Sequence, residues 1–358
     1  MKIKSALLVF FHGKSNAGGT ERVVQYLEEY LISKELQTEI IDEARLLNTT
    51  LGKWYKKLFN HKHFAKRKPI YMARFASAYL WWRKRRDRLM FTNGETAPFY
   101  PVDFVMNHGC YYKMELDYGW PAHPMGRVAN LQRLGCLYGK EIVTVAEKVK
   151  EELVQYYKVP ASKIDVVSNP VNSDYFKPLP KEKSAVKNIV YIGRLEPGKG
   201  LKELQALAEI IEKTDGWHLL IASNNAHNTA LFSSFKRTTV KVGLTIENIN
   251  EEAYSKADLV IYPSHSESFG MVTIEALSAG VPIVATAVGI IPALLERAFP
   301  GVYLLPKFED ESILKTFDEM IRQFDTTIDR QALHDLIKME FGIPGFRKRL
   351  DTIIGERL

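Results

Sequence analysis

Two acidic residues eight positions apart frame a polar loop in the C-terminal half of the chain. Glu267 and Glu275 lie in the stretch ADLVIYPSHSESFGMVTIEALSAGVPIVA, from Ala257 to Ala285. Helical side chains lean toward the N-terminus, so Glu275, about one turn inside a helix, can reach the same mouth as Glu267. At the positive end of that helix, four residues would offer unpaired backbone N–H groups: Ser268, Phe269, Gly270 and Met271. Carboxylates combined with such N–H groups suit a polyhydroxylated, anionic ligand.

The residues around this loop predict a strand, a loop, a helix and a second strand. Leu259–Tyr262 is a short apolar run typical of a buried strand, and Met271–Ala279 contains good helix formers until Gly280 and Pro282 end the helix. Ile283–Ala285 begins the next apolar run. In such a βαβ unit the loop lies at the carboxyl end of a parallel sheet, where open sheets bind ligands.

A basic, glycine-rich loop opens the second half of the chain. The string G-R-L-E-P-G-K-G follows a strand expected at Asn188–Ile192 and precedes a helix expected from Leu201. Arg194 offers a bidentate fork and Lys199 a point charge, and both suit a diphosphate at a helix N-terminus. On its own, the string is also compatible with a basic turn that holds no ligand.

Together, the glutamate loop and the basic loop resemble the donor site of the retaining glycosyltransferases of family four. The resemblance implies an α/β fold of GT-B architecture, with two Rossmann-like domains facing across a cleft and a C-terminal helix that crosses back to the first domain. In that family, Glu267 and the amides after it would hold hydroxyls of the donor sugar, and Glu275 would hold the nucleotide ribose. Arg194 and Lys199 would clamp the diphosphate of the donor.

Four further positions gain a role from the resemblance. Gly18 and Gly19 lie between an expected strand and an expected helix, where a plain tight turn is the alternative to a contact with the donor diphosphate. His108 follows the strand expected at Val102–Met106 and would contact the donor sugar beside the reacting centre, although a histidine there is more often structural. Gly243 resembles a strand end whose backbone contacts the nucleobase.

The same resemblance predicts where the domains divide. We expect an acceptor-side domain at residues 1–178, a nucleotide-sugar domain at 187–340, and a crossing helix at 341–358. Pro170 replaces the glycine that the family usually has at its hinge, which affects the hinge geometry and not the expected boundary.

Composition excludes several other classes of protein. The chain has 358 residues, of which 46% are hydrophobic and 25% charged, as in ordinary globular proteins and unlike disordered or fibrous ones. Cys110 and Cys136 match neither a metal-binding spacing nor a disulfide framework, so a reducing cytoplasm is the simplest compartment. No run approaches the roughly 20 apolar residues that cross a bilayer.

The basic residues are concentrated in one segment. Residues 53–88 contain thirteen Lys or Arg and one acid, Asp87, in a chain whose net charge is +7. Aromatic residues are interleaved with the bases, and one set has the spacing of a helix face: Tyr71, Phe75, Tyr79, Trp82 and Leu89. Core packing and an interface are equally open roles for that face. We expect an anionic membrane surface to be the partner of the segment, especially of four consecutive bases: Arg83, Lys84, Arg85 and Arg86.

These observations predict a retaining, metal-independent glycosyltransferase with His108, Glu267, Arg194 and Lys199 at its catalytic centre. The chain has no suitable Asp-x-Asp motif, so we expect neither a metal nor a cofactor. The donor would be a nucleotide sugar, typically UDP-linked, carrying a hexose or N-acetylhexosamine. The acceptor would be a glycan or lipid-linked glycan of lipopolysaccharide or surface polysaccharide synthesis, met at the inner face of the cell membrane.

Two other classes of function remain open. A nucleotide-sugar epimerase or a sugar phosphorylase of the same fold would retain the phosphate clamp. A nucleic-acid-binding protein would use residues 53–88 on phosphates, but this alternative leaves the glutamate loop unexplained, and no nucleic acid is expected.

Overall fold

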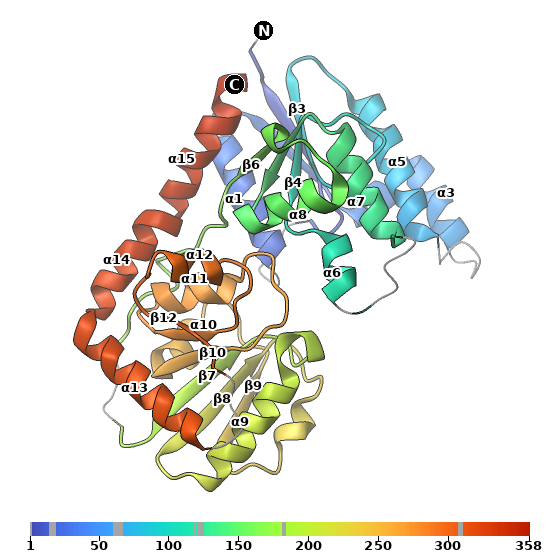
Figure 1. Ribbon diagram of the computed structural model, residues 1–358. Helices are drawn as coiled ribbons and strands as arrows, with labels where there is room; N and C mark the ends of the chain where they lie inside the picture. Colours follow the sequence, from blue (N-terminus) through green and yellow to red (C-terminus); the bar gives the residue numbers. More distant parts are fainter. Residues whose placement is uncertain are drawn as a thin grey trace. The chain divides into compact units, whose positions relative to one another are not determined.

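The computed structural model describes residues 2–13, 19–59, 67–117, 119, 125–180, 184–306 and 311–358 (Figure 1). The chain divides into two compact units. Unit 1 contains Met1–Ser168 together with Arg347–Leu358, and unit 2 contains Asn169–Phe346. The segment 169–178, which we expected to belong to the first domain, therefore clusters with the second.

Unit 1 is built on a parallel sheet of six strands in the order β2-β1-β3-β4-β5-β6. Its strands are β1 (Ser5–Val9), β2 (Gln37–Ile41), β3 (Arg88–Asn93), β4 (Phe104–Asn107), β5 (Glu141–Thr144) and β6 (Ile164–Val166). The chain moves from β1 outward to β2 and then returns to β3 on the other side of β1. The strand order therefore reverses between β1 and β3, and in open parallel sheets such a switch point is where ligands bind.

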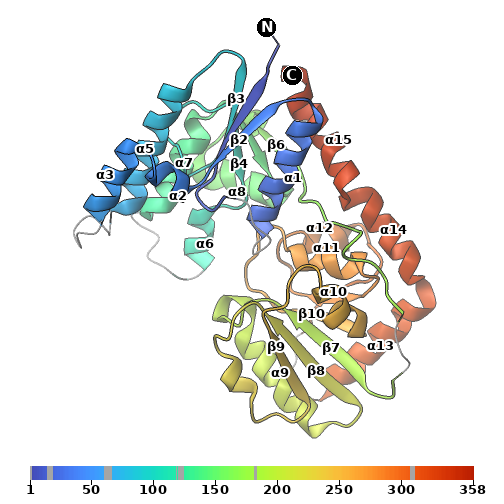
Figure 2. The same ribbon diagram turned by 180° about the vertical axis from the view of Figure 1, so that it is seen from behind.

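Helices cover both faces of the first sheet. They are α1 (Gly19–Ser33), α2 (Glu43–Leu47), α3 (Thr50–Phe59), α5 (Lys68–Arg83), α6 (Tyr111–Asp117), α7 (Arg127–Tyr138) and α8 (Glu147–Tyr157). Helix α1 lies on one face, and α5, α7 and α8 lie on the other (Figures 1 and 2). The segment Arg347–Leu358 packs on α1, where the Tyr30 hydroxyl donates a hydrogen bond to Asp351 at 2.8 Å.

Unit 2 contains a second parallel sheet of six strands in the order β12-β11-β10-β7-β8-β9. The strands are β7 (Lys187–Ile192), β8 (Trp217–Ser223), β9 (Thr238–Val242), β10 (Leu259–Tyr262), β11 (Ile283–Ala285) and β12 (Val302–Leu304). Counted within the unit, the order is 6-5-4-1-2-3, which is that of a Rossmann fold. Its switch point lies between β7 and β10, whose backbones pair at Leu259 with Ile189.

The helices of unit 2 pack around this sheet. They are α9 (Leu201–Lys213), α10 (Ile249–Glu252), α11 (Met271–Ser278), α12 (Ile291–Glu296), α13 (Ser312–Thr327), α14 (Arg330–Phe341) and the start of α15 (Ile343–Ile354). Helix α14 packs on α11. Leu204 and Leu207 of α9 share a core with Phe317 of α13 and with strand residues such as Ile221. Removal of this apolar surface from water, at about 25 cal/mol per Å², holds the helices on the sheet.

The expected fold class, two Rossmann-like α/β domains, is confirmed. The strands predicted at Leu259–Tyr262 and Ile283–Ala285 have the predicted bounds. Strand β3 was missed, and the helical spacing that ran from Tyr71 to Leu89 was wrong at its end: α5 stops at Arg83, and Leu89 lies in β3. Among the described helices, none combines the length and the apolar character that spanning a membrane requires.

Candidate functional site

The switch point of unit 2 brings the two predicted donor loops together. One loop follows β7 and the other follows β10, and the backbone N–H of His265 donates to the carbonyl of Gly198 at 3.1 Å. Gly200 has φ +82°, and a Cβ there would lie 2.5 Å from Pro263. Only glycine fits this contact, so the basic loop and the glutamate loop form one rigid surface.

A lysine and a glutamate meet on this surface. Lys199 Nζ lies 2.6 Å from Glu267 Oε1, and the Ser264 hydroxyl donates to the same oxygen at 2.8 Å. The two charged side chains are largely buried, with 19% and 14% of their surface exposed. Burial, followed by the negative charge of Glu267, raises the pKa of the neighbouring Tyr262 hydroxyl well above its ordinary value. An ammonium and a carboxylate are thereby held at one point of the surface.

A third loop, after β11, supports the residues that follow Glu267. Gly289 has φ +58°, and a Cβ there would lie 2.3 Å from the Phe269 carbonyl oxygen. That carbonyl accepts a hydrogen bond from Ile290 N at 2.9 Å, and the Phe269 ring meets Phe341 edge to face at 6.3 Å. Helix α11 begins just after Gly270, itself at φ +87°, so its first N–H groups lie beside Glu267.

The sequence also predicts donor contacts for five other residues: Gly18, Gly19, Arg194, Gly243 and Glu275. Glu275 is only 4% exposed, and its Oε2 accepts a hydrogen bond from the Tyr254 hydroxyl at 3.0 Å. Arg194 is exposed and contacts Glu196 at 3.0 Å. Gly243 follows β9, which β8 separates from β7. Gly18 lies outside the described residues, and Gly19 is the first residue of α1.

Unit 1 has a pocket of about 220 Å³ at its own switch point. It is lined by His12, Glu21, Asn93, Glu95, Met106, Asn107, His108, Tyr111 and Gln132. Gln132 holds the wall together, because its amide donates to Asn107 Oδ1 at 2.7 Å and to the Gly109 carbonyl at 2.9 Å. Its Oε1 accepts hydrogen bonds from Tyr111 N and the Tyr157 hydroxyl. The loop that carries His108 is fixed in this way.

His108 presents an unusual buried imidazole to that pocket. Both ring nitrogens are buried, and neither has a hydrogen-bond partner within the described part of the chain. Burial lowers the pKa of His108 to about 4, so the ring is neutral at neutral pH. A neutral imidazole offers one donor and one acceptor, here both available to a ligand.

The folding stability should therefore depend on pH through His108. The pKa falls from an ordinary value of about 6.5 to about 4, so between these pH values the unfolded chain binds more protons, and stability rises with pH. From pH 7.5 to pH 5, His108 should remove about 2 kcal/mol from the free energy of unfolding. Denaturant titrations at both pH values measure the free energy of unfolding. Its change between pH 7.5 and pH 5 should be smaller in His108→Gln than in the parent, and replacement of the exposed His227 by Gln should leave that change as in the parent.

Of the residues that line this pocket, only His108 was a predicted site residue, and the others include Asn93, Glu95 and Tyr111. Asn93 and Glu95 lie at and just after the end of β3, the strand that was missed, within the string NGE. Recognition of RLMFTN as a short buried strand would have placed both at a ligand-binding edge. Tyr111 opens α6.

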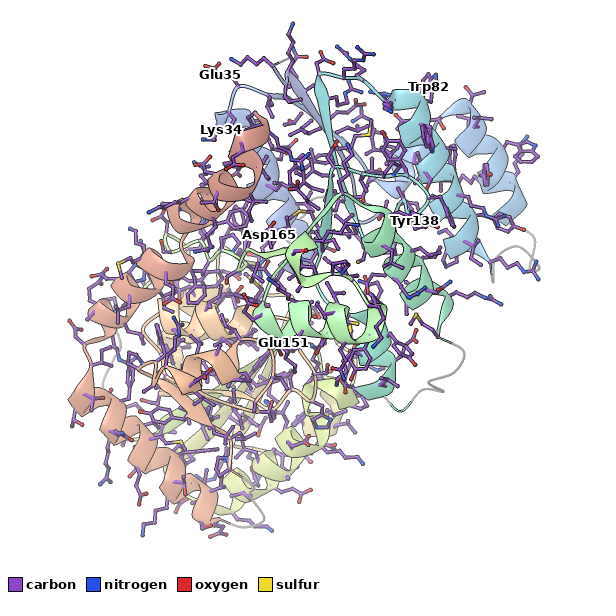
Figure 3. All side chains as sticks on the ribbon, turned by 45° about the horizontal axis from the view of Figure 1, so that its top comes forward. Lys34, Glu35, Trp82, Tyr138, Glu151 and Asp165 are labelled. Carbon is purple, nitrogen blue, oxygen red and sulfur yellow. The ribbon has the colours of Figure 1, made fainter. Side chains whose placement is uncertain are left out.

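The described part of the basic segment comprises most of α3, all of α5, the turn after α5 and the start of β3. Tyr55 of α3 stacks on Phe75 of α5 with the ring centroids 4.9 Å apart. Of the four consecutive bases, Arg83 pairs with Glu39 and Arg85 with Asp87 at 3.0 Å. Trp82, labelled at the end of α5 in Figure 3, is 77% exposed. The predicted aromatic face is thus divided: Phe75 and Tyr79 belong to the core and Trp82 to the surface.

Comparison with protein families accounts for both halves of the chain. Residues 17–175 match the model described as Glycosyltransferase Family 4, and residues 174–332 match Glycosyl transferases group 1. The D-inositol 3-phosphate glycosyltransferase of Segniliparus rotundus is 32% identical over 169 residues, 42% of this chain and 37% of that protein. The chain spans about half or less of the length of the curated relatives it matches.

Solved structures share the fold over nearly the whole chain. Anabaena HepE, solved in complex with UDP-glucose, has a TM-score of 0.64 and 14% identity, covering 98% of this chain and 99% of its own. WaaG, described as a glycosyltransferase involved in lipopolysaccharide biosynthesis, has a TM-score of 0.68 and 15% identity, covering 98% and 100%.

Fold and family models together define a GT-B protein with a Rossmann-like unit on each side of residue 169. Each half of the chain matches a glycosyltransferase model, and the chain belongs to the glycosyltransferases of family four.

Proposed function

We propose that this protein transfers a hexose or N-acetylhexosamine from a UDP-sugar to a glycan or glycolipid acceptor, with retention at the anomeric carbon and without a metal ion. The observation that carries the proposal is the Lys199–Glu267 pair at the switch point of unit 2, beside the N-terminus of α11. The UDP-glucose in the HepE structure supports a donor of this class.

In the proposed reaction, Lys199 and the first N–H groups of α11 stabilise charge on the departing diphosphate. The bond between the anomeric carbon and the phosphate oxygen breaks, and its electron pair leaves with the nucleotide. The acceptor hydroxyl forms the new bond on the same face and gives its proton to the leaving phosphate. Glu267 accepts hydrogen bonds from donor hydroxyls and so fixes the sugar ring. Fixed positive groups of this kind take over the role that a divalent ion has in other enzymes.

His108 of unit 1 is the other residue to which we assign a catalytic role. His108, neutral and with both ring nitrogens unpartnered among the described residues, is suited to hydrogen-bond an uncharged sugar hydroxyl. The likeness to WaaG supports, for the acceptor, a glycan of lipopolysaccharide or surface polysaccharide synthesis.

Nucleotide binding gives the first test of this function. At 100 times its dissociation constant, UDP should stabilise the protein by about 2.7 kcal/mol and raise Tm by about 5–10 °C, with smaller shifts for GDP and ADP. Arg194→Ala should reduce the shift, while Lys202→Ala, an exposed lysine on α9, should leave it unchanged.

Product analysis completes that test. Incubation with UDP-sugars in EDTA, followed by NMR of the new linkage, should give a glycoside with the anomeric configuration of the donor. Activity that disappears in EDTA and returns with magnesium would contradict the metal-independent mechanism. Release of an epimerised nucleotide sugar, or of a sugar phosphate in phosphate buffer, would instead identify an epimerase or a phosphorylase.

We also propose that α3 and α5 hold the protein against an anionic lipid surface. Four large apolar side chains on these helices are strongly exposed: Leu51, Trp54, Trp81 and Trp82. Exposed bases lie among them on the same helices and just after α5: Lys53, Lys56, Lys57, Lys84 and Arg86. Aromatic rings favour the membrane interface, and adjacent positive charges add attraction to anionic headgroups.

A further inference from the structure

The pocket of unit 1 has a polar and acidic lining. Glu21 and Glu95 contribute carboxylates, and Asn93, Asn107 and Gln132 contribute amides. Within the described ranges of the chain, the residues that line the pocket include no lysine or arginine. The pocket therefore contrasts with the donor surface of unit 2, where Lys199 provides positive charge.

Two of the lining residues have buried polar atoms without a hydrogen-bond partner among the described residues. Asn93 is 7% exposed, and its buried Oδ1 accepts no hydrogen bond from any described residue. Both ring nitrogens of His108 are also buried without a hydrogen-bond partner among the described residues. A buried polar atom without a partner costs about 1–3 kcal/mol, which a ligand with hydroxyl groups would remove. The loop beside them is held by Gln132, which donates to Asn107 Oδ1 and to the Gly109 carbonyl.

Glu95 sets the charge preference of the pocket. Burial raises the pKa of its carboxyl group, and the Tyr111 hydroxyl donates to Glu95 Oε1 at 3.4 Å. The carboxyl group can still accept hydrogen bonds from a ligand. The raised pKa means that this part of the pocket disfavours a negative charge. A phosphate would bring such a charge into the same poorly screened surroundings, beside Glu21 and with no lysine or arginine in the described lining.

We propose that this pocket binds the hydroxyl-bearing ring of a neutral polyol acceptor, and that Glu95 excludes acceptors phosphorylated on that ring. The inference rests on the proposed transferase function. Glu95 hydrogen-bonds and orients the acceptor, while the proton of the attacking hydroxyl goes to the leaving diphosphate as described above. The acceptor class then differs from the inositol phosphate in the names of curated relatives such as that of Segniliparus rotundus.

Paired probes test the acceptor class. With a UDP-sugar that the protein turns over, methyl glucoside, methyl galactoside and methyl heptoside are compared with their 6- or 7-phosphates. At least one neutral glycoside should be an acceptor, with kcat/KM at least tenfold above that of its phosphate. Equal or better use of the phosphates, or donor hydrolysis without transfer to any neutral glycoside, would overturn the inference. Absence of all nucleotide-sugar binding and turnover would instead contradict the proposed function.

A variant of Glu95 tests its role in the preference for neutral over phosphorylated acceptors. Glu95→Gln should raise the KM for the neutral acceptor about tenfold, leave the KM for the donor unchanged, and reduce the preference for neutral over phosphorylated acceptors about tenfold. The matched control is Glu152→Gln, because burial also raises the pKa of Glu152 in the same unit but Glu152 does not line the pocket. The control should match the parent in all three quantities.

Tyr111→Phe provides a second, milder change. It removes the hydroxyl that donates to Glu95 and should shift the same acceptor KM and the same preference a few-fold in the same direction. If Glu95→Gln unfolds the protein, Tyr111→Phe still tests whether Glu95 selects the acceptor. An altered donor KM with an unchanged acceptor preference, in either variant, would show that Glu95 does not select the acceptor.

Discussion

Lys199→Ala is expected to lower kcat/KM for transfer by about 10²- to 10³-fold, the usual effect of removing one group that stabilises charge in a transition state. Lys199 lies in the short 3₁₀ turn Pro197–Lys199, and Gly200 directly after it is packed on Pro263. The ammonium therefore has a fixed position at the switch point. Steady-state kinetics with the parent's donor and acceptor measure the loss.

The matched control for Lys199→Ala is Lys202→Ala, which removes an exposed lysine in the first turn of α9. Loss of one partner of a largely buried ion pair also costs stability, so Tm is measured on every variant. Glu267→Ala should mainly lower kcat. Because the two side chains contact each other, the double variant should lose less than the two single losses combined. Parent-like kcat/KM for Lys199→Ala would remove the diphosphate clamp from the mechanism.

Neutralising four exposed bases, two on α3 and two just after α5, is expected to weaken binding to anionic vesicles by about 10³-fold, since each contributes about 1 kcal/mol. The variant combines Lys53→Gln, Lys56→Gln, Lys84→Gln and Arg86→Gln. Arg83 is left intact because it pairs with Glu39 inside the unit. Cosedimentation with vesicles containing phosphatidylglycerol measures the binding.

A control with the same loss of charge separates local from general electrostatics. It replaces four exposed lysines elsewhere: Lys158, Lys202, Lys236 and Lys338. Vesicle binding by the parent should fall steeply with salt, because the attraction is screened over about 8 Å at physiological ionic strength. Equal sedimentation of the two quadruple variants would contradict a membrane-facing role for α3 and α5. Transfer to a soluble acceptor should be unchanged in both.

The donor loops were predictable from the sequence because their elements are short and sharply bounded. Apolar runs ended by Pro263, Gly280 or Pro282 leave little choice of register, and the structure has strands β10 and β11 where they were expected. The contact between Lys199 and Glu267 was not predicted. The two residues are 68 positions apart, and only the crossover from β7 to the adjacent β10 brings them together.

The acceptor-side pocket could not be predicted because its position depends on β3. Leu89 lies seven residues after Trp82, a spacing that continues a helical period, although the chain has already left the helix at Lys84. Without β3, nothing indicated that Asn93 and Glu95 lie beside His108. The hydrogen bond of Glu275 was not predicted either: residues 273–278 of α11 are all buried, and the Glu275 carboxylate accepts from the Tyr254 hydroxyl, a contact that helical periodicity alone does not reveal.

The way the chain is divided between the units determines which unit has all its elements first during synthesis. Unit 2 is one continuous segment, whereas unit 1 takes its last helix from Arg347–Leu358. That helix bonds to α1 through Tyr30 and Lys34, which both contact Asp351. Residues 347–358 follow every strand of unit 2 in the chain, so when they are synthesised unit 2 already has all its strands and unit 1 still lacks the helix that covers α1. The half that is translated first is thus the half whose folding is completed last.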